Sequence, residues 1–364
     1  MRRPFVLTPR PHHRPRRGTP LRALAAVPVL ALVVTACGSS AGDDAAAEAD
    51  TITLATHDSW AMPEEVLDAF RDETGIEVVV QPQGDAGTLT NKLVLTRDNP
   101  LADGVYGIDN TFGSRAVDEG VLAPYDAALP EEAEQYRLPG GERELTPVDF
   151  GDVCVNYDRT WFEEEGLEPP RSLDDLLDPA YADLFVTPGA ATSSPGLAFL
   201  LATVAAEGDD WPAYWEALVD NGAKVTAGWS DAYEVDFTAG GGGGDRPLVL
   251  SYSSSPPFTV PEGGDEPTTA ALLDTCYRQV EYAGVLEGAA NPEGMQQLID
   301  FMVGEQFQEA LPDNMYVYPV TDVALPEAWA EHAPTAETPY AVDPAEVAAN
   351  REGWVREWRD LVSR

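Results

Sequence analysis

Short apolar segments alternate with helical patterns along residues 51–119, and this alternation constrains the fold more than any other feature. Thr51–Ala55, Ile76–Val80 and Ala102–Ile108 are apolar segments of strand length. The residues between them repeat apolar side chains at helical spacing. An apolar β-branched run such as Ile76–Val80 is typical of a buried parallel strand. The pattern therefore predicts a parallel α/β sheet, whose ligands bind beyond the carboxyl ends of its strands.

The length of the chain predicts two lobes, because the roughly 315 residues from Asp50 onward exceed what one hydrophobic core usually serves. Pro147–Tyr157 is expected to cross from the first lobe to the second, and Cys276–Tyr282 to cross back. A single helix is expected over 292–307. The expected division is 51–149 for lobe 1 with 277–320 returning to it, and 150–276 for lobe 2, with 321–364 as a C-terminal helical segment.

Residues 1–36 have the pattern of a lipoprotein signal peptide. Seven arginines and no acidic residue occupy 1–22, and the apolar run 24–34 is about half the ~20 residues of a membrane span. Small residues before Cys37 suit peptidase cleavage, and the cysteine itself suits lipidation. Residues 37–50 are small and acidic, which predicts a flexible tether. We expect a protein exported and lipid-anchored to the outer face of the cytoplasmic membrane, in the periplasm or at the cell surface. A plain signal peptide with a chance cysteine is the alternative.

Charge excludes several classes of partner. The chain has 22 basic and 63 acidic residues, and removing the seven N-terminal arginines leaves 15 against 63, or about −48. So acidic a surface argues against nucleic acid and anionic lipid. Beyond the signal only His57 and His332 remain, without zinc-ligand spacing, so neither a metal nor a cofactor is expected. Cys154 and Cys276 are a possible disulfide, because two thiols outside the cytoplasm usually pair.

The segment 192–196, Thr-Ser-Ser-Pro-Gly, precedes an apolar helix. Serine at the N-cap and proline at the first helical position leave backbone N–H groups free at the positive end of the helix. Such an end holds a phosphate or a carboxylate, although an ordinary N-cap has the same sequence.

Aromatic side chains and carboxylates follow several predicted strands. Aromatic rings in such loops can stack on a flat ring or face a cation, and carboxylates can pair with positive charge. Taken singly, each aromatic side chain is better explained by core packing, and each aspartate by a solvated turn. Together with the helix start at 192–196, they describe a flat cationic ligand that bears a phosphate. The residues are Asp58, Asp109, Trp229, Asp231, Tyr233 and Tyr252.

Residues 51–364 resemble the thiamine-binding components of bacterial ABC transporters for thiamine and thiamine pyrophosphate. This resemblance implies an α/β, two-lobe fold of the type II periplasmic-binding-protein class. Each lobe would be a mixed, mostly parallel sheet flanked by helices, with hinge strands between the lobes. The blocks that carry the resemblance are 56–60, 107–110, 192–197, 228–233, 250–256, 301–308 and 318–320.

The resemblance also implies a function. The protein would be a monomer without enzymatic activity that captures thiamine, thiamine monophosphate or thiamine pyrophosphate by lobe closure. It would deliver the ligand to a membrane permease that works with a cytoplasmic ATPase. The thiamine moiety would contact His57, Asp58, Asp109, Trp229, Tyr252 and Tyr316. The phosphates would contact Ser193, Ser194, Gly196, Trp229 and Tyr233.

Two alternatives remain open. A binding protein of the same fold could take iron, a polyamine or a phosphonate. Iron would require paired tyrosines with histidine or carboxylate ligands, and Tyr252 alone does not supply them. A thiamine-degrading transferase of this fold would use Cys154 as its nucleophile, and a disulfide with Cys276 is the competing role for that thiol.

Overall fold

The computed structural model describes residues 51–363. The predicted signal peptide 1–36, the lipidation site Cys37 and the tether 37–50 lie outside the described residues, as does Arg364, and those assignments stay predictions. None of the helices within 51–363 is both long enough and apolar enough to cross a membrane.

The predicted alternation of strands and helices builds the first part of the sheet. β1 pairs in parallel with both β2 and β3. The prediction of a buried strand at Ile76–Val80 is wrong, however. β2 ends the sheet, so it has one neighbouring strand, and Val79 is 39% exposed. The elements are β1 (Thr51–Thr56), α2 (Glu64–Thr74), β2 (Glu77–Pro82), α3 (Ala86–Thr96), β3 (Gly104–Asp109), α4 (Gly113–Asp118) and β4 (Leu122–Ala123).

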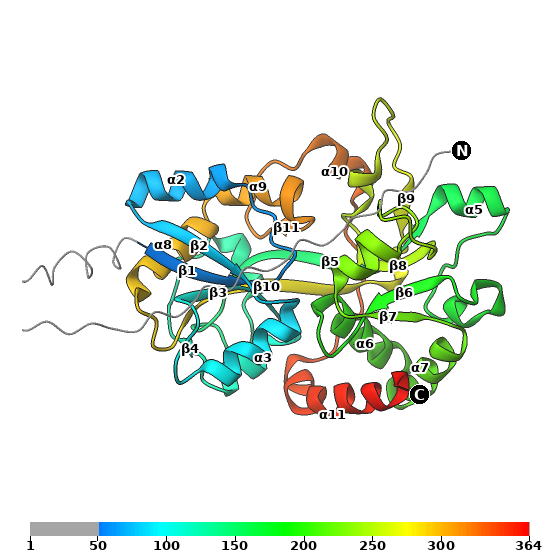
Figure 1. Ribbon diagram of the computed structural model, residues 1–364, viewed down its shortest axis with the longest axis horizontal. Coiled ribbons are helices and arrows are strands. Elements are labelled where there is room, and N and C mark those ends of the chain that lie inside the picture. The colour runs from blue at the N-terminus through cyan, green and yellow to red at the C-terminus, as the bar shows by residue number, and fades with distance from the viewer. Residues whose placement is uncertain (1–50, 364) are drawn as a thin grey trace, which may run out of the picture. The chain divides into compact units, whose positions relative to one another are not determined.

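Two long strands carry the sheet from one half to the other (Figure 1). β5 (Thr146–Asp158) and β10 (Tyr277–Leu286) pair with each other antiparallel, β10 also pairs with β3, and β5 also pairs with β8. The sheet has 11 strands, with the main order β2-β1-β3-β10-β5-β8-β6-β7. The crossing predicted for 147–157 and 276–282 is therefore found, and it joins the two expected sheets into one.

The second half repeats the pattern of a strand followed by a helix. β6 pairs in parallel with both β7 and β8. The C-terminal helix α11 packs on this half, where the rings of Trp215 and Trp358 lie edge to face, 5.6 Å apart. Where one lobe ends and the other begins stays a prediction. The elements are α5 (Arg159–Glu165), β6 (Phe185–Pro188), α6 (Ser194–Glu207), α7 (Trp211–Asp220), β7 (Lys224–Thr226), β8 (Leu248–Tyr252), β9 (Thr269–Ala271) and α11 (Pro344–Val362).

The helix predicted over 292–307 is two helices. α8 (Pro292–Met302) ends before Gly304, whose extended backbone (φ −80°, ψ 157°) starts α9 (Glu305–Met315). The segment then enters β11 (Tyr318–Pro319), which pairs with β5, and α10 (Glu327–His332) follows. The break turns the chain so that the end of α9 reaches the cavity described below.

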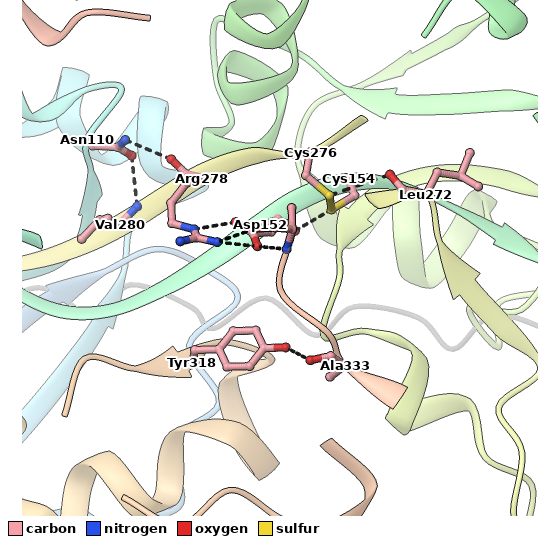
Figure 2. Close-up of polar contacts among 10 residues, drawn as sticks. Asn110, Asp152, Cys154, Leu272, Cys276, Arg278, Val280, Tyr318 and Ala333 are labelled. Carbon is pink, nitrogen blue, oxygen red and sulfur yellow. Dashed lines mark hydrogen bonds and ion pairs between the residues drawn. A yellow bond between two sulfur atoms is a disulfide. The ribbon is translucent and has the colours of Figure 1, made fainter. Parts of the chain in front are cut away.

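Contacts between distant residues fasten β5 to β10 (Figure 2). Cys154 and Cys276 are joined by a disulfide, and both are fully buried. Nearby, the guanidinium of Arg278 donates to both carboxylate oxygens of buried Asp152 at 2.6 and 2.8 Å. The backbone N–H of Ala336 donates to the same carboxylate at 2.7 Å. These contacts fix the crossing strands relative to each other.

Candidate functional site

A cavity of ≈ 240 Å³ lies between the two halves, beyond the ends of β1 and β8. This volume is just below the range of about 300–1,000 Å³ that is usual for small-molecule sites. Six of the predicted site residues line it, namely His57, Asp58, Ser194, Trp229, Tyr252 and Tyr316. Other lining residues were not predicted, and they include Ser59, Trp60, Asp85, Ser230, Glu234, Glu281, Asn314 and Met315.

Aromatic rings form one wall of the cavity. Trp229 stacks on Tyr233 with ring centroids 5.0 Å apart and planes 13° apart, and Tyr316 meets Trp229 edge to face at 5.8 Å. Tyr252 lies 6.5 Å from Trp229 at a tilt. Gly151 makes room for the Tyr252 ring, because a Cβ there would lie 2.7 Å from it. Such a wall can stack on a flat ring or face a cation.

Two hydrogen bonds hold Trp229 in position. Its indole N–H donates to the hydroxyl of Ser251 at 3.0 Å, and its backbone N–H donates to the carboxylate of Asp85 at 3.0 Å. Asp85 belongs to the loop between β2 and α3, so this second bond connects the two halves. The tryptophan is therefore held before any ligand arrives, which lowers the entropic cost of binding.

Asp85 is the main site residue that the sequence reasoning missed. Its carboxylate accepts from the backbone N–H of Ala86 at 2.7 Å and caps α3, and it also lies 3.4 Å from the backbone N of Ser194 at the start of α6. The helix end for which a phosphate was predicted thus already has a protein carboxylate beside it. The available signal was an aspartate directly before a helix and after a strand, in the same position as Asp58 and Asp109.

Charged groups form the floor of the cavity. Burial lowers the pKa of His57, but the charge and hydrogen bond of Glu281, 3.7 Å away, together with the charges of Asp85 and Asp58, outweigh this and raise the pKa overall. Burial raises the pKa of Asp85, against the lowering effect of the Ser193 hydroxyl and of backbone N–H groups. Burial and the charge of Glu281 raise the pKa of Asp149 well above its ordinary value. The carboxylates of Asp58, Asp85 and Glu281 line the cavity and favour a cation as ligand.

Glu281 is the second missed residue, and it stands in the middle of β10. Its carboxylate accepts from the Tyr106 hydroxyl at 3.3 Å and from the Gln279 amide at 3.2 Å. An acidic residue between the apolar residues Val280 and Tyr282 of a buried strand was the available signal, because a buried charge is costly and marks a special environment.

Four predicted residues do not line the cavity. Asp109 is fully buried and accepts from Thr111 and Phe112 in its own turn, while burial raises its pKa to about 6. Ser193 is buried at the N-cap of α6. A Cβ on Gly196 would lie 2.5 Å from the carbonyl oxygen of Pro188, so this glycine permits close packing. Tyr233 supports Trp229 from behind. Asp231, also singled out above, is exposed at the start of a helical turn.

Tyr316 has an unusual backbone, with φ at 61°. A side chain in the left-handed region is strained by about 1 kcal/mol or more, and such residues cluster at functional sites. The backbone carbonyl of Tyr316 accepts from the Ser254 hydroxyl, and its ring stacks on Phe258 at 3.6 Å. These contacts hold the tyrosine over the cavity.

Within residues 51–363 no group of three or more histidine, cysteine, aspartate or glutamate side chains is placed to hold a metal ion. What the cavity offers is therefore an aromatic wall, several carboxylates and the start of a helix.

A mixed sheet crossed by two long strands, with a cavity between its halves, defines a solute-binding protein of the type II periplasmic-binding class. Accordingly, the family model of the bacterial extracellular solute-binding proteins matches residues 99–253. The thiamine-binding periplasmic protein of Escherichia coli K12 is 33% identical over 320 residues, which cover 86% of this chain and 94% of that protein. The chain belongs to the family of thiamine-binding periplasmic proteins.

Two further comparisons agree. The thiamine-binding periplasmic protein of Brucella suis is 33% identical over 330 residues, covering 88% of this chain and 94% of its own. A solved structure of a periplasmic thiamin binding protein superposes with a TM-score of 0.76 at 32% identity, covering 86% of this chain and 96% of that one. In keeping with these relatives, the chain is an extracytoplasmic binding protein.

Proposed function

We propose that this protein captures thiamine and its phosphate esters for an ABC importer. The observation that carries the proposal is the pairing of an aromatic wall, formed by Trp229 and Tyr252, with the carboxylates of Asp85 and Glu281 in one cavity. Thiamine has two flat rings, and its thiazolium ring bears a permanent positive charge. Stacking and charge therefore both favour it. The names of the relatives support the same ligand.

Binding is proposed to proceed by lobe closure. Several contacts already bridge the cleft. They include Asp85 to Trp229, Gly87 N–H to the Thr192 carbonyl at 3.0 Å, and Ser59 to Ser230 with hydroxyl oxygens 3.5 Å apart. A ligand that contacts both sides adds to these bonds and shifts the population toward the closed form. The permease would recognise that form, and its cytoplasmic ATPase would drive import.

The phosphate esters require a local rearrangement. Their phosphates would reach the start of α6, where Ser194 and backbone N–H groups are available and where the helix dipole favours an anion. The Asp85 carboxylate lies 3.4 Å from the Ser194 nitrogen and would have to move or take up a proton. Unphosphorylated thiamine is therefore the best-matched of the three ligands.

Transport rather than catalysis is supported by the state of Cys154. The transferase alternative needs this sulfur as a nucleophile, but it is bonded to Cys276 and does not line the cavity. A lipid on Cys37 is proposed to keep the protein near its permease, because a body of about −48 charges is repelled by an anionic membrane.

Calorimetric titration with thiamine, thiamine monophosphate and thiamine pyrophosphate tests the proposal. We expect binding in the micromolar range or tighter. Trp229→Ala should weaken it by about 1–2 kcal/mol, roughly five- to thirtyfold. Trp161→Ala, on α5 outside the cavity, is the matched control and should bind normally. If none of the three compounds binds in this range, the ligand assignment is wrong.

A further inference from the structure

Four arginines line a second, separate pocket of ≈ 300 Å³ between α11 and the pair α3 and α4. They are Arg115 on α4 and Arg351, Arg356 and Arg359 on α11. Figure 1 shows α11, in red, beside α3, in cyan. Only 15 basic residues follow the signal peptide, against 63 acidic ones in the chain, so four in one pocket is a pronounced concentration of positive charge.

Three of these four arginines lack a carboxylate partner, unlike most other basic residues of the described chain. Among residues 51–363, no carboxylate lies within ion-pair distance of Arg115, Arg356 or Arg359, and Arg351 reaches only Glu352, at 3.7 Å. Most other basic residues of the described chain are paired, as are Arg71, Arg97, Arg137, Arg159, Arg171, Lys224, Arg246 and Arg278. In so acidic a chain, the missing partners leave positive charge that a ligand could neutralise.

The inner part of the pocket is desolvated. Arg351 is only 5% exposed and lies over the ring of Phe112, with its guanidinium carbon 5.6 Å from the centroid. Arg115 donates to the neutral amide oxygen of Asn91 at 2.6 Å, while its Nε is buried without a hydrogen-bond partner. A buried donor without a partner is costly, and an acceptor that enters the pocket would remove that cost.

Repulsion between the arginines adds to this cost. Burial and the neighbouring charge of Arg115 lower the pKa of Arg351, and the charges of Glu352, Asp109 and Asp118 oppose this only in part. Guanidinium groups present planar forks of donors that match phosphate and carboxylate oxygens, and several of them together suit an anion of more than one charge.

We propose that this pocket is an accessory binding site for a multivalent oxyanion of the phosphate type, separate from the ligand cavity. Arg115 follows β3 in the first half of the sheet, whereas α11 packs against α7 in the second half. An anion held by both therefore ties the two halves together and stabilises the folded protein. The source is a soluble ion rather than a lipid headgroup, because the acidic surface is repelled by anionic membranes.

The experiment is calorimetric titration of the purified protein with inorganic pyrophosphate at low chloride. The variant Arg356→Gln/Arg359→Gln removes two exposed charges from the pocket without disturbing buried packing. Its matched control, Arg159→Gln/Arg171→Gln, removes the same charge elsewhere on the surface. We expect natural protein and control to bind alike, and the pocket variant and Arg115→Gln to bind about tenfold more weakly or worse.

Two outcomes would overturn the proposal: equal loss of pyrophosphate binding in both double variants, or no binding by any of the proteins up to about 10 mM. Co-sedimentation with phosphatidylglycerol vesicles tests whether the pocket binds a lipid headgroup instead of a soluble ion. Binding to vesicles without binding to free pyrophosphate would assign the site to a membrane instead. As an independent readout, pyrophosphate should raise the Tm of the natural protein and the control, but not that of the pocket variant.

Discussion

Removing the disulfide between Cys154 and Cys276 should destabilise the protein strongly without changing its ligand. The bond joins residues 122 positions apart, a segment that includes β6 to β9 and the helices between them. The loop-entropy relation for a closed loop of this length gives about 5 kcal/mol at 25 °C, near the upper end of measured values. Because unfolded chains retain some compactness, we expect a measured loss of about 3–5 kcal/mol.

The assay is urea unfolding of Cys154→Ala/Cys276→Ala, followed by circular dichroism. Alanine is chosen because both positions are fully buried and serine would bury an unpaired hydroxyl. The natural protein unfolded in the presence of a reductant is the control and should lose about the same free energy of unfolding. The double variant should be insensitive to the reductant.

Ligand titration of the same variant separates the stabilising role of the two cysteines from any role in ligand binding. Neither cysteine lines the cavity, so thiamine affinity should stay within about threefold of that of the natural protein. A loss of stability below about 1 kcal/mol would refute the reasoning from loop length. Loss of thiamine binding in a folded variant would instead return Cys154 to consideration as a functional residue.

Three further outcomes follow from the site. Asp85→Asn should weaken thiamine binding about tenfold, because the bound cation loses a carboxylate partner. It should also shift the preference toward the phosphate esters, and calorimetry with all three ligands measures the ratio of their affinities. Tyr252→Ala should weaken all three ligands, whereas Ser194→Ala should weaken only the phosphorylated ones, and equal losses in both variants would contradict that division. The pKa of Asp109 is raised from 3.8 to about 6 in the folded protein. Between these two pH values the folded protein holds a proton that the unfolded chain releases. The free energy of unfolding therefore falls by about 3 kcal/mol as the pH rises from 3.8 to about 6. Unfolding of Asp109→Asn at pH 4 and pH 7 should show this decline removed, and an unchanged decline would count against the raised pKa.

Local patterns in the sequence predicted much of the architecture. Strand-length apolar segments placed β1, β2 and β3 to within a few residues, and helical spacing predicted the helices between them, because a side-chain period of two or 3.6 is a property of neighbouring residues. The same holds for the crossing strands β5 and β10. The segments that follow predicted strands directed attention to Trp229 and Tyr252, and both line the cavity, since the carboxyl ends of parallel strands gather at one edge.

Errors arose where the decisive neighbour is remote in the chain. Ile76–Val80 has the composition of a buried strand, but burial depends on what packs against both faces, and β2 has a neighbouring strand on one side only. The helix over 292–307 was predicted to continue through Gly304, but in the structure one helix ends before this glycine and a second helix begins after it.

The sequence by itself therefore determined the strands and the crossing segments, because these depend on composition and short spacings. Only the tertiary structure decided which charges meet in the cavity. Asp85 contacts Ser194 and Trp229 across separations of 109 and 144 residues. These hydrogen bonds depend on how the two halves of the sheet lie relative to each other. The residues around Asp85, Ser194 and Trp229 contain no local pattern that indicates this geometry.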